Sequence, residues 1–329
     1  MLPSSDPAAP VARPPLAQCA STVLMIRPAT FGANPETAAS NAFQSAAAGT
    51  PRDRDAAVAE FDAAVDALER AGIEVIVVDD LADPPKPDAV FPNNWLSLHH
   101  DGTAVLYPML SPLRRRERRR DVIAAIEARG FTVRRVLDLT GWESSALFLE
   151  GTGSLVLDHR MRVAYACLSP RTARRPLEQF AAELGYVPHA FRASGPKGED
   201  VYHTNVLMCV GEGFAAACLD AVGDPVERRR LREGLAAAGR ELVELDRAQM
   251  NAFAGNMLAL RSVHGTPIVA LSDTAWNALD ASRRAQLGRH GGIVTAALPT
   301  IERCGGGSLR CMLAEVFLPR LEGPAARVG

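Results

Sequence analysis

The sequence predicts a mixed α/β fold in which five similar modules close into a ring within a single domain. The first observation is a recurring pattern of an amphipathic helix, a glycine and a short β-branched strand. The second is regular spacing, because successive glycines lie 58, 55, 54 and 52 residues apart, at Gly72, Gly130, Gly185, Gly239 and Gly291. The third is a composition of 47% hydrophobic and 22% charged residues, which is typical of a packed core.

Each of these glycines is expected to end its helix in the left-handed conformation, which glycine adopts without a steric penalty. The helix before Gly72 carries an apolar stripe of Val58, Phe61, Val65 and Leu68. The strands after the glycines are expected at Ile73–Val78, Phe131–Val133, Tyr186–Val187, Glu241–Val243 and Ile293–Val294. Further apolar segments, at Ser145–Leu149, Ser154–Leu157 and Asn205–Val210, bring each unit to two or three strands and one helix.

A doubly wound sheet also alternates helices and strands, and it stays open as the alternative fold. Near-equal units from Thr22 to Leu318 favour the ring, in which no unit buries its apolar face alone. The Pro- and Ala-rich start predicts a flexible tail over residues 1–21, followed by one catalytic domain over residues 22–329.

Composition argues against several classes of protein. A net charge of −2 does not suit a nucleic-acid binder that depends on bulk positive charge. No apolar run approaches the roughly 18 residues of a membrane span, and the tail lacks the features of a signal peptide. Six cysteines without a Cys-x-x-Cys pair indicate free thiols and a cytoplasmic location. No metal-ligand spacing and no nucleotide-binding glycine loop is found, so neither metal nor organic cofactor is expected.

Polar residues gather in four otherwise apolar segments, 88–95, 147–153, 202–207 and 304–312. Together these segments supply a nucleophile in Cys311, a proton carrier in His203 and an orienting carboxylate in Glu150. Each residue also has a structural explanation: a small buried residue for Cys311, a hydrogen-bonded structural histidine at the start of a strand for His203, and a surface carboxylate at the end of a strand for Glu150. Taken alone, the pair Asn93–Asn94 is more typical of a turn than of a binding site.

Three motifs, Ile26-Arg27-Pro28, Phe31-Gly32-Ala33-Asn34-Pro35-Glu36-Thr37 and Gly305-Gly306-Gly307-Ser308-Leu309-Arg310-Cys311-Met312, resemble the guanidino-group-modifying superfamily. This superfamily includes arginine deiminases, dimethylarginine dimethylaminohydrolases and amidinotransferases. The resemblance extends over nearly the whole chain and is strongest to the citrulline-utilising hydrolases. It implies the five-bladed α/β propeller called a pentein.

The resemblance also implies roles for individual residues. Cys311, His203 and Glu150 take the places of the catalytic residues, although Thr152 and Gly153 depart from the family's Glu-Gly-Gly-Asp motif. Arg171, in the segment Leu168-Ser169-Pro170-Arg171-Thr172, takes the place of a ligand for the substrate carboxylate. Its companion falls on Arg114, with Arg115 and Arg116 as alternative registers, and Asp88 falls near the substrate head group.

Two further departures concern the substrate. Asn94 and Asn205 stand where deiminases hold the guanidinium with carboxylates. A carboxamide offers both a donor and an acceptor to a neutral ureido group, whereas a buried guanidinium needs a compensating charge. With Asn93 as a further contact, the sequence therefore predicts a citrulline ureidase, which converts L-citrulline and water to ornithine, carbon dioxide and ammonia through a covalent Cys311 intermediate.

Two other functions stay open. The same three catalytic residues would serve a hydrolase or amidinotransferase that acts on a guanidino compound. A non-catalytic pentein would instead bind a partner on its ring. The expected ligand is a small amino acid, with no nucleic acid or membrane partner, and a homo-oligomer is left open.

Overall fold

The computed structural model describes residues 16–37, 50–237 and 239–321. In this part of the chain, strands form five three-stranded sheets. The first combines β1 (Thr22–Arg27), β2 (Glu74–Asp79) and β15 (Ala314–Glu315), and the second combines β3 (Leu96–Leu98), β4 (Thr103–Leu106) and β5 (Arg135–Asp138). The others are β6 (Val156–Asp158), β7 (Val163–Cys167) and β8 (Val187–Phe191); β9 (Met208–Val210), β10 (Phe214–Ala217) and β11 (Glu241–Glu244); and β12 (Leu258–Arg261), β13 (Pro267–Ser272) and β14 (Gly292–Ala296).

All five sheets have the same internal topology. The middle strand pairs antiparallel with one neighbour and parallel with the other. In the first sheet, the first strand of the chain pairs with the last, with Val23 opposite Glu315. The predicted unit of two or three strands and one helix is therefore confirmed, and the two ends of the described chain meet in one sheet.

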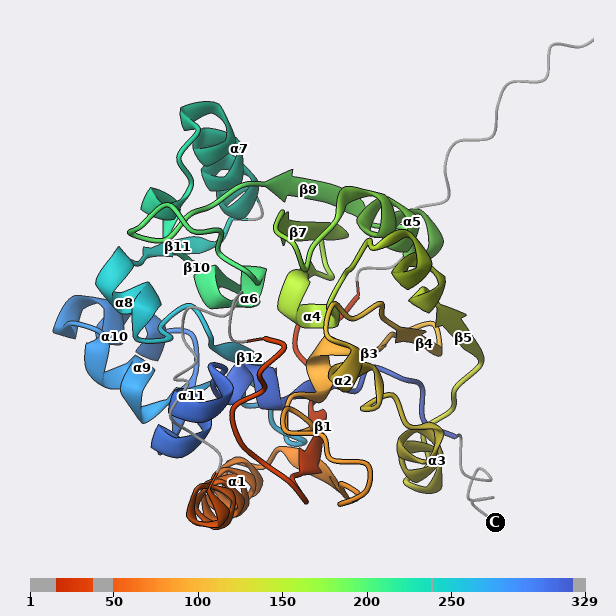
Figure 1. The fold of residues 1–329 in the computed structure, drawn as a ribbon. Coiled ribbons are helices and arrows are strands. Elements are labelled where there is room, and N and C mark those ends of the chain that lie inside the picture. The colour runs from red at the N-terminus through yellow and green to blue at the C-terminus, as the bar shows by residue number, and fades with distance from the viewer. Residues whose placement is uncertain (1–15, 38–49, 238, 322–329) are drawn as a thin grey trace, which may run out of the picture.

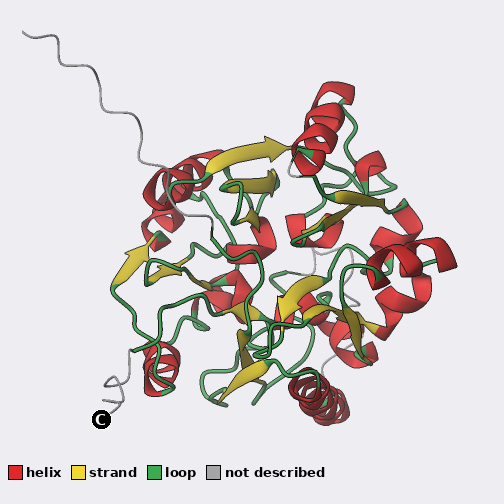
Figure 2. Cartoon of the chain, turned by 180° about the vertical axis from the view of Figure 1, so that it is seen from behind, coloured by secondary structure: helices red, strands yellow, loops and turns green. Residues whose placement is uncertain are grey.

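The longer helices lie outside the sheets (Figures 1 and 2). Each precedes the parallel strand of its sheet: α1 (Pro51–Arg70), α3 (Arg120–Ala128), α5 (Arg174–Leu184), α7 (Pro225–Ala236) and α10 (Ala281–Gly288). A capping box between Thr50 and Asp53 starts α1, whose buried face includes Phe61, Val65 and Leu68. The connecting helices are α2 (Pro112–Arg115), α8 (Arg247–Asn251), α9 (Asp273–Ala278), α11 (Pro299–Gly305) and the 3₁₀ helices η2 (Thr140–Ser145) and η3 (Leu219–Ala221).

Four of the five predicted left-handed glycines are confirmed. Gly72, Gly130, Gly185 and Gly239 have φ values between 70° and 84°. Gly291 does not have a positive φ, so the prediction is wrong there. A Cβ at position 291 would lie 2.8 Å from the backbone of Pro267, so this glycine permits close packing of two strands.

Two predicted strands do not form, and the one expected over Asn205–Val210 is reduced to Met208–Val210, because Thr204–Leu207 form the helical turn α6. Residues 131–133 are not a strand, because β5 begins only at Arg135, and Phe131 makes an isolated bridge with Arg320 instead. Residues 145–149 contribute only an isolated bridge between Leu149 and Thr172. Both segments are apolar because they pack against neighbouring elements without joining a sheet ladder.

The packed fold reaches into the expected N-terminal tail. Gln18 is buried, and its side-chain amide donates to the carbonyl oxygens of Leu157 and Val210 at 3.0 and 3.2 Å. Its side-chain oxygen accepts from the His159 amide at 2.9 Å. Residues 18–21 therefore belong to the fold, while residues 1–15 lie outside the described part. In the described ranges, no helix has the length and apolar character needed to cross a membrane.

Five short turns meet near the centre of the molecule. They are η1 (Pro92–Asn94), α4 (Gly151–Ser154), α6 (Thr204–Leu207), residues 253–256 and η4 (Leu309–Met312). Each lies immediately before the first strand of a unit: β3, β6, β9, β12 or β15. Figure 1 shows α4 and α6 at the inner ends of the sheets, away from the outer helices. Every turn touches the next, and the last touches the first.

Two glycines allow these turns to touch. A Cβ at Gly151, whose φ is 47°, would lie 2.1 Å from the Asn93 carbonyl oxygen. A Cβ at Gly255, whose φ is not positive, would lie 2.3 Å from the Val206 carbonyl oxygen. Contacts this short do not occur, so a side chain at either position would push neighbouring turns apart.

We expect Gly255→Ala to lower the free energy of unfolding by about 3 kcal/mol, because overpacking at a backbone contact forces a shift. Urea denaturation of both proteins measures the effect. Gly288→Ala is the matched control, since a Cβ there meets nothing within 4 Å and its φ is not positive. Equal loss of stability in the two variants would contradict the packing argument.

Candidate active site

The five turns bring most of the predicted site residues to one cavity. Its lining consists of Thr37, Asp88, Phe91, Asn94, Arg114, Arg171, Tyr202, His203, Gly305, Gly306, Gly307 and Cys311. Glu150 is buried and hydrogen-bonded to His203, and Asn205 contacts Cys311, so both adjoin this lining. Asn93 is buried but does not line the cavity.

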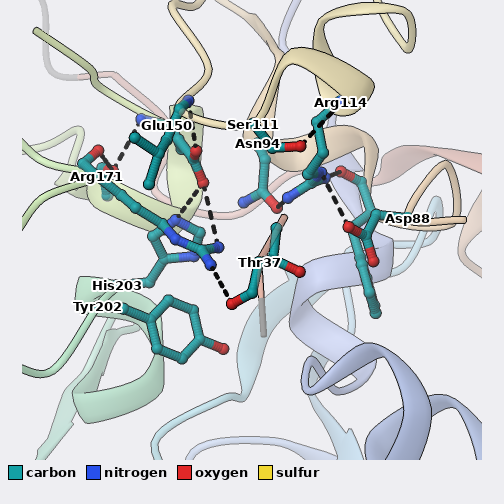
Figure 3. A network of polar contacts seen from close by, with 12 residues as sticks. Thr37, Asp88, Asn94, Ser111, Arg114, Glu150, Arg171, Tyr202 and His203 are labelled. Atoms are coloured by element: carbon teal, nitrogen blue, oxygen red, sulfur yellow. Dashed lines mark hydrogen bonds and ion pairs between the residues drawn. The ribbon is translucent and has the colours of Figure 1, made fainter. Parts of the chain in front are cut away.

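Glu150 and His203 form a buried pair (Figure 3). The Glu150 Oε2 and His203 Nε2 atoms lie 2.8 Å apart, and the Leu110 amide donates to Glu150 Oε1 at 3.0 Å. Burial raises the pKa of Glu150, but Arg171 and His203 outweigh it and lower the pKa to about 2. An ionised carboxylate only accepts hydrogen bonds, so the imidazole proton is on Nε2 and Nδ1 is left as the basic nitrogen.

His203 is neutral at pH 7 in this arrangement. Burial lowers its pKa to about 4, with Glu150 opposing the shift and Arg171 adding to it. The position of Nδ1 is set by Gly153, where a Cβ would lie 2.7 Å from that nitrogen. A neutral imidazole with a free basic nitrogen is able to take a proton from a thiol.

The sequence suggested a strand end for Glu150 and a strand start for His203, and neither position is found. Glu150 precedes α4 and His203 precedes α6, each in the N-cap position of a single helical turn. These turns are too short to show helical periodicity in the sequence. Their apolar residues are buried because the turns lie at the centre of the molecule.

Cys311 lies on η4, after the glycine loop. The loop is close-packed, since a Cβ at Gly305 or Gly307 would lie 2.7 or 3.0 Å from the Phe91 ring. Two side-chain amides reach the sulfur: Asn205 Nδ2 at 3.5 Å and Asn256 Nδ2 at 3.2 Å. Sequence reasoning missed Asn256, whose only signal was its place in the fourth central turn, equivalent to Asn94 and Asn205 in theirs.

Asn94 is held by a buried cluster of charges (Figure 3). Arg114 Nη1 donates to Asn94 Oδ1 at 2.8 Å, and Arg114 makes two further bonds of 2.9 Å to the two oxygens of Glu117. Asp88 lies 3.6 Å from the same guanidinium and accepts from Asn34 at 2.8 Å. Both oxygens of Glu117 accept from Arg114, so this carboxylate is ionised here, although burial raises its pKa to about 7.

The sequence left Arg114, Arg115 and Arg116 as possible companions of Arg171, and Arg114 is the buried one of the three. Arg115 instead pairs with Glu143 at 3.3 Å, and Arg116 is exposed. Most donors of Arg114 are already used by Glu117, Asn94 and the Phe91 carbonyl. This geometry makes Arg114 the group that orients Asn94.

Arg171 is the second buried arginine of the cavity. Its guanidinium lies 3.6 Å from Glu150, donates to the Thr37 carbonyl at 3.4 Å, and stacks over the Tyr202 ring at 5.0 Å. Tyr202 is fixed in turn, because its hydroxyl donates to the Gly306 carbonyl at 2.7 Å. Arg171 therefore combines contact with the His203–Glu150 pair and a place on the cavity wall.

Asn93 is not part of the lining, and its backbone packs against α4. Its carbonyl oxygen accepts from the Thr152 hydroxyl at 3.4 Å. Thr152 thus joins two central turns, and the missing side chain at Gly153 leaves room for both His203 and the Asn94 amide, which lies 2.3 Å from where a Cβ would be. Across residues 16–37, 50–237 and 239–321, no cluster of three His, Cys, Asp or Glu side chains is arranged to hold a metal ion.

The His203 environment makes stability depend on pH. Because its pKa is about 4 when folded and near 6.5 when unfolded, the unfolded chain binds the proton first as the pH falls, and stability is lost across that window. From about pH 7 to about pH 5 this group removes about 2 kcal/mol. His203→Gln should lose correspondingly less stability over this range in urea denaturation. His264→Gln, which changes an exposed histidine, should follow the parent; a parent-like pH slope for His203→Gln as well would contradict the burial argument.

Comparison with known proteins supports the same fold. The chain superimposes on the arginine dihydrolase ArgZ, from the ornithine–ammonia cycle in cyanobacteria, with a TM-score of 0.70 and 19% identity over 91% of this chain. It spans 41% of that ArgZ chain, but 99% of the isolated ArgZ N-terminal domain bound to product, with a TM-score of 0.69 and 19% identity over 91% of this chain.

Two more solved structures are similar. AgrE, in a ternary complex with ornithine and NAD⁺, has a TM-score of 0.70 and 20% identity over 92% of this chain and 40% of its own. A dimethylarginine dimethylaminohydrolase variant, as an adduct with S-methyl-L-thiocitrulline, has a TM-score of 0.62 and 16% identity over 90% of this chain and 99% of its own. No curated protein matched in sequence.

A family model describes the relationship more directly. The model for eukaryotic N,N dimethylarginine dimethylhydrolase matches residues 27–318, which include all the central turns and every residue of the cavity. The resemblance stated from the sequence motifs is therefore confirmed. This chain belongs to the N,N dimethylarginine dimethylhydrolase family, within the pentein superfamily of guanidino-modifying enzymes.

Proposed function

We propose that this protein is a citrulline ureidase, which hydrolyses L-citrulline to ornithine, carbon dioxide and ammonia. The single observation that carries the proposal is the orientation of the Asn94 amide. Arg114 has only donors, so the atom that it contacts at 2.8 Å is the amide oxygen. The Asn94 amide nitrogen is left pointing toward the His203 side, where it is buried and has no partner among the described residues (Figure 3).

This orientation discriminates between the two substrate classes. A guanidinium presents only N–H donors, so it would meet the Asn94 N–H donors without forming a hydrogen bond. A ureido group presents a carbonyl oxygen that accepts from them. Leaving a buried donor unpaired costs roughly 1–3 kcal/mol, so the site favours the ureido group.

The surroundings of Cys311 agree with a neutral reacting group. Among the described residues, the polar side chains that contact the sulfur are the carboxamides of Asn205 and Asn256, which carry no charge to balance a guanidinium. The side-chain oxygen of Asn205 has no partner in the described part of the chain, so it is free to accept from a ureido N–H. The Asn94 donor therefore complements the ureido oxygen, and the Asn205 acceptor complements a ureido N–H.

Other residues take supporting roles in the proposal. Arg171 binds the α-carboxylate of the substrate, since this buried cation reaches the cavity wall. Arg114, proposed from sequence as its companion, instead holds Asn94, and Asp88 balances its charge. Asn93 supports α4 through Thr152. We further propose that the five sheets close as a five-bladed propeller and form one catalytic domain.

The chemistry follows from these placements. Cys311 gives its proton to His203 Nδ1 and attacks the ureido carbon, and the oxyanion accepts from Asn94. His203 returns the proton to a leaving nitrogen as the carbon–nitrogen bond breaks, which leaves a thiocarbamate on the sulfur. Water, deprotonated by His203, then attacks the thiocarbamate carbon and the carbon–sulfur bond breaks. His203 returns the proton to the departing Cys311 sulfur, and the released carbamic acid decomposes to the second amine and carbon dioxide. Glu150 holds the imidazole and stabilises its charged form.

A guanidino substrate is the second candidate function, because the similar ArgZ is described as an arginine dihydrolase. Release of ornithine and ammonia from citrulline, measured beside product release from arginine and dimethylarginine, separates the two. The proposal predicts turnover of citrulline and little or none of the others. Turnover of arginine or dimethylarginine alone would overturn it.

We expect Asn94→Asp to lower kcat for citrulline about 10²- to 10³-fold, because it removes the donor to the developing oxyanion and adds a negative charge beside it. Asn277→Asp, at an exposed position on α9, is the matched control and should keep the parent rate. Parent-like turnover by Asn94→Asp would show that the amide does not contact the reacting group.

The reactivity of the Cys311 thiol tests the alternative that this protein is a non-catalytic scaffold. Iodoacetamide should modify Cys311 faster than any other cysteine, and citrulline should protect it, because the sulfur lines the cavity. Cys311→Ala should abolish both the rapid modification and the turnover. A parent with no rapidly modified thiol and no turnover on any of the three substrates would favour the scaffold.

A further inference from the structure

Asn256 reaches the Cys311 sulfur from the fourth central turn. It is fully buried in the fourth central turn, and its side-chain nitrogen lies 3.2 Å from Cys311 Sγ. The same nitrogen lies 3.1 Å from the Asn205 backbone carbonyl. A carbonyl only accepts, so this contact fixes which end of the amide faces the sulfur.

The two hydrogens of this amide therefore have two separate targets. One is held by the Asn205 carbonyl, and the other points at the sulfur. Asn205 adds a second N–H₂ group at 3.5 Å, so two carboxamides converge on the same atom. Donors arranged in this way stabilise a sulfur that carries negative charge more than one that carries a proton.

Such donors matter because His203 supplies no positive charge to the sulfur until it has taken the thiol proton. An imidazolium beside the sulfur commonly stabilises the thiolate. His203 is uncharged at pH 7, since burial lowers its pKa to about 4. The positive charges of the site, on Arg114 and Arg171, are bound to Glu117 and lie beside Glu150, respectively.

We propose that Asn256 is a catalytic residue that, together with Asn205, stabilises the Cys311 thiolate by direct hydrogen bonding. Its buried side-chain oxygen, which has no partner within the described ranges, accepts from a ureido N–H once substrate is bound. No other atom is transferred: the amide keeps its protons throughout, and the thiol proton goes to His203. This role rests on the proposed function only for the substrate contact, since the thiolate contact exists without substrate.

Gly255 explains how the sequence achieves this placement. A Cβ there would lie 2.3 Å from the Val206 carbonyl, so only glycine lets the fourth turn approach α6. That approach puts Asn256 within reach of both the Asn205 carbonyl and the sulfur. The side chain is thus placed by backbone packing between two neighbouring turns.

The test is the pH dependence of Cys311 alkylation by iodoacetamide, followed by mass spectrometry of the Cys311 peptide, in the full chain without substrate. Asn256→Ala should move the midpoint of the rate curve up by about one pH unit, which is about tenfold slower alkylation at neutral pH. Asn256→Asp has nearly the same shape but replaces the donor with a negative charge, so it should shift the midpoint further. Asn277→Ala is the matched control and should match the parent.

Circular dichroism and thermal melting identify which variants fold, and the near-isosteric Asn256→Asp guards against collapse of the Ala variant. A folded Asn256 variant with the parent midpoint would overturn the proposal. A shifted midpoint in a protein that turns over arginine but not citrulline would uphold the role of Asn256 and reject the ureidase. An unshifted midpoint in an active citrulline ureidase would do the reverse.

Discussion

The buried pair of Arg114 and Glu117 is the interaction on which the chemistry of the site depends. Two bonds of 2.9 Å lock the guanidinium, and its remaining nitrogen then dictates the orientation of Asn94. Breaking a buried ion pair leaves an uncompensated charge, which is strongly unfavourable, so this orientation is held firmly. The Asn94 carboxamide could otherwise point either its oxygen or its nitrogen into the site, and the ion pair fixes the nitrogen there as a donor.

Close packing also fixes the state of the polar groups on the other central turns. Each of the five turns brings polar side chains or backbone groups to the centre, and glycines without room for a Cβ let adjacent turns touch. His203 is uncharged because it is buried, and Glu150 is charged because Arg171 and His203 outweigh its burial. The charges of this pair and the His203 tautomer therefore follow from burial and contact at the central turns, whereas the Arg114–Glu117 pair sets the Asn94 orientation. The outer helices and sheets serve to hold that packing.

Prediction from the sequence succeeded where a residue type has a single structural reason for its position. The repeat was visible because a glycine that ends a helix leaves a regular mark, and four of the five such glycines have the expected left-handed backbone. It failed at Gly291, where the cause is a close approach of Pro267, and at residues 131–133, where apolar residues pack outside a sheet. A glycine in the sequence indicates either a left-handed backbone or a close approach of another segment, and the sequence alone does not distinguish the two.

The sequence predicted which residues form the candidate site better than it predicted which residues contact one another. Cys311, His203, Glu150, Asn94 and Arg171 meet as the motifs suggested, yet Arg114 turned out to hold Asn94 through a partner, Glu117, that no motif marks. Asn256 carries no motif at all, because its position follows from contact between turns far apart in sequence. Long-range contacts of this kind are fixed by packing and leave no local pattern.

The most direct measurement is a crystal structure of Cys311→Ala, which cannot turn over substrate, with L-citrulline bound. We expect the ureido oxygen to accept from Asn94 Nδ2 at about 2.9 Å while Arg114 keeps its hydrogen bond to the Asn94 oxygen. A ureido nitrogen facing Asn94, or an Asn94 side chain that has left Arg114, would contradict it.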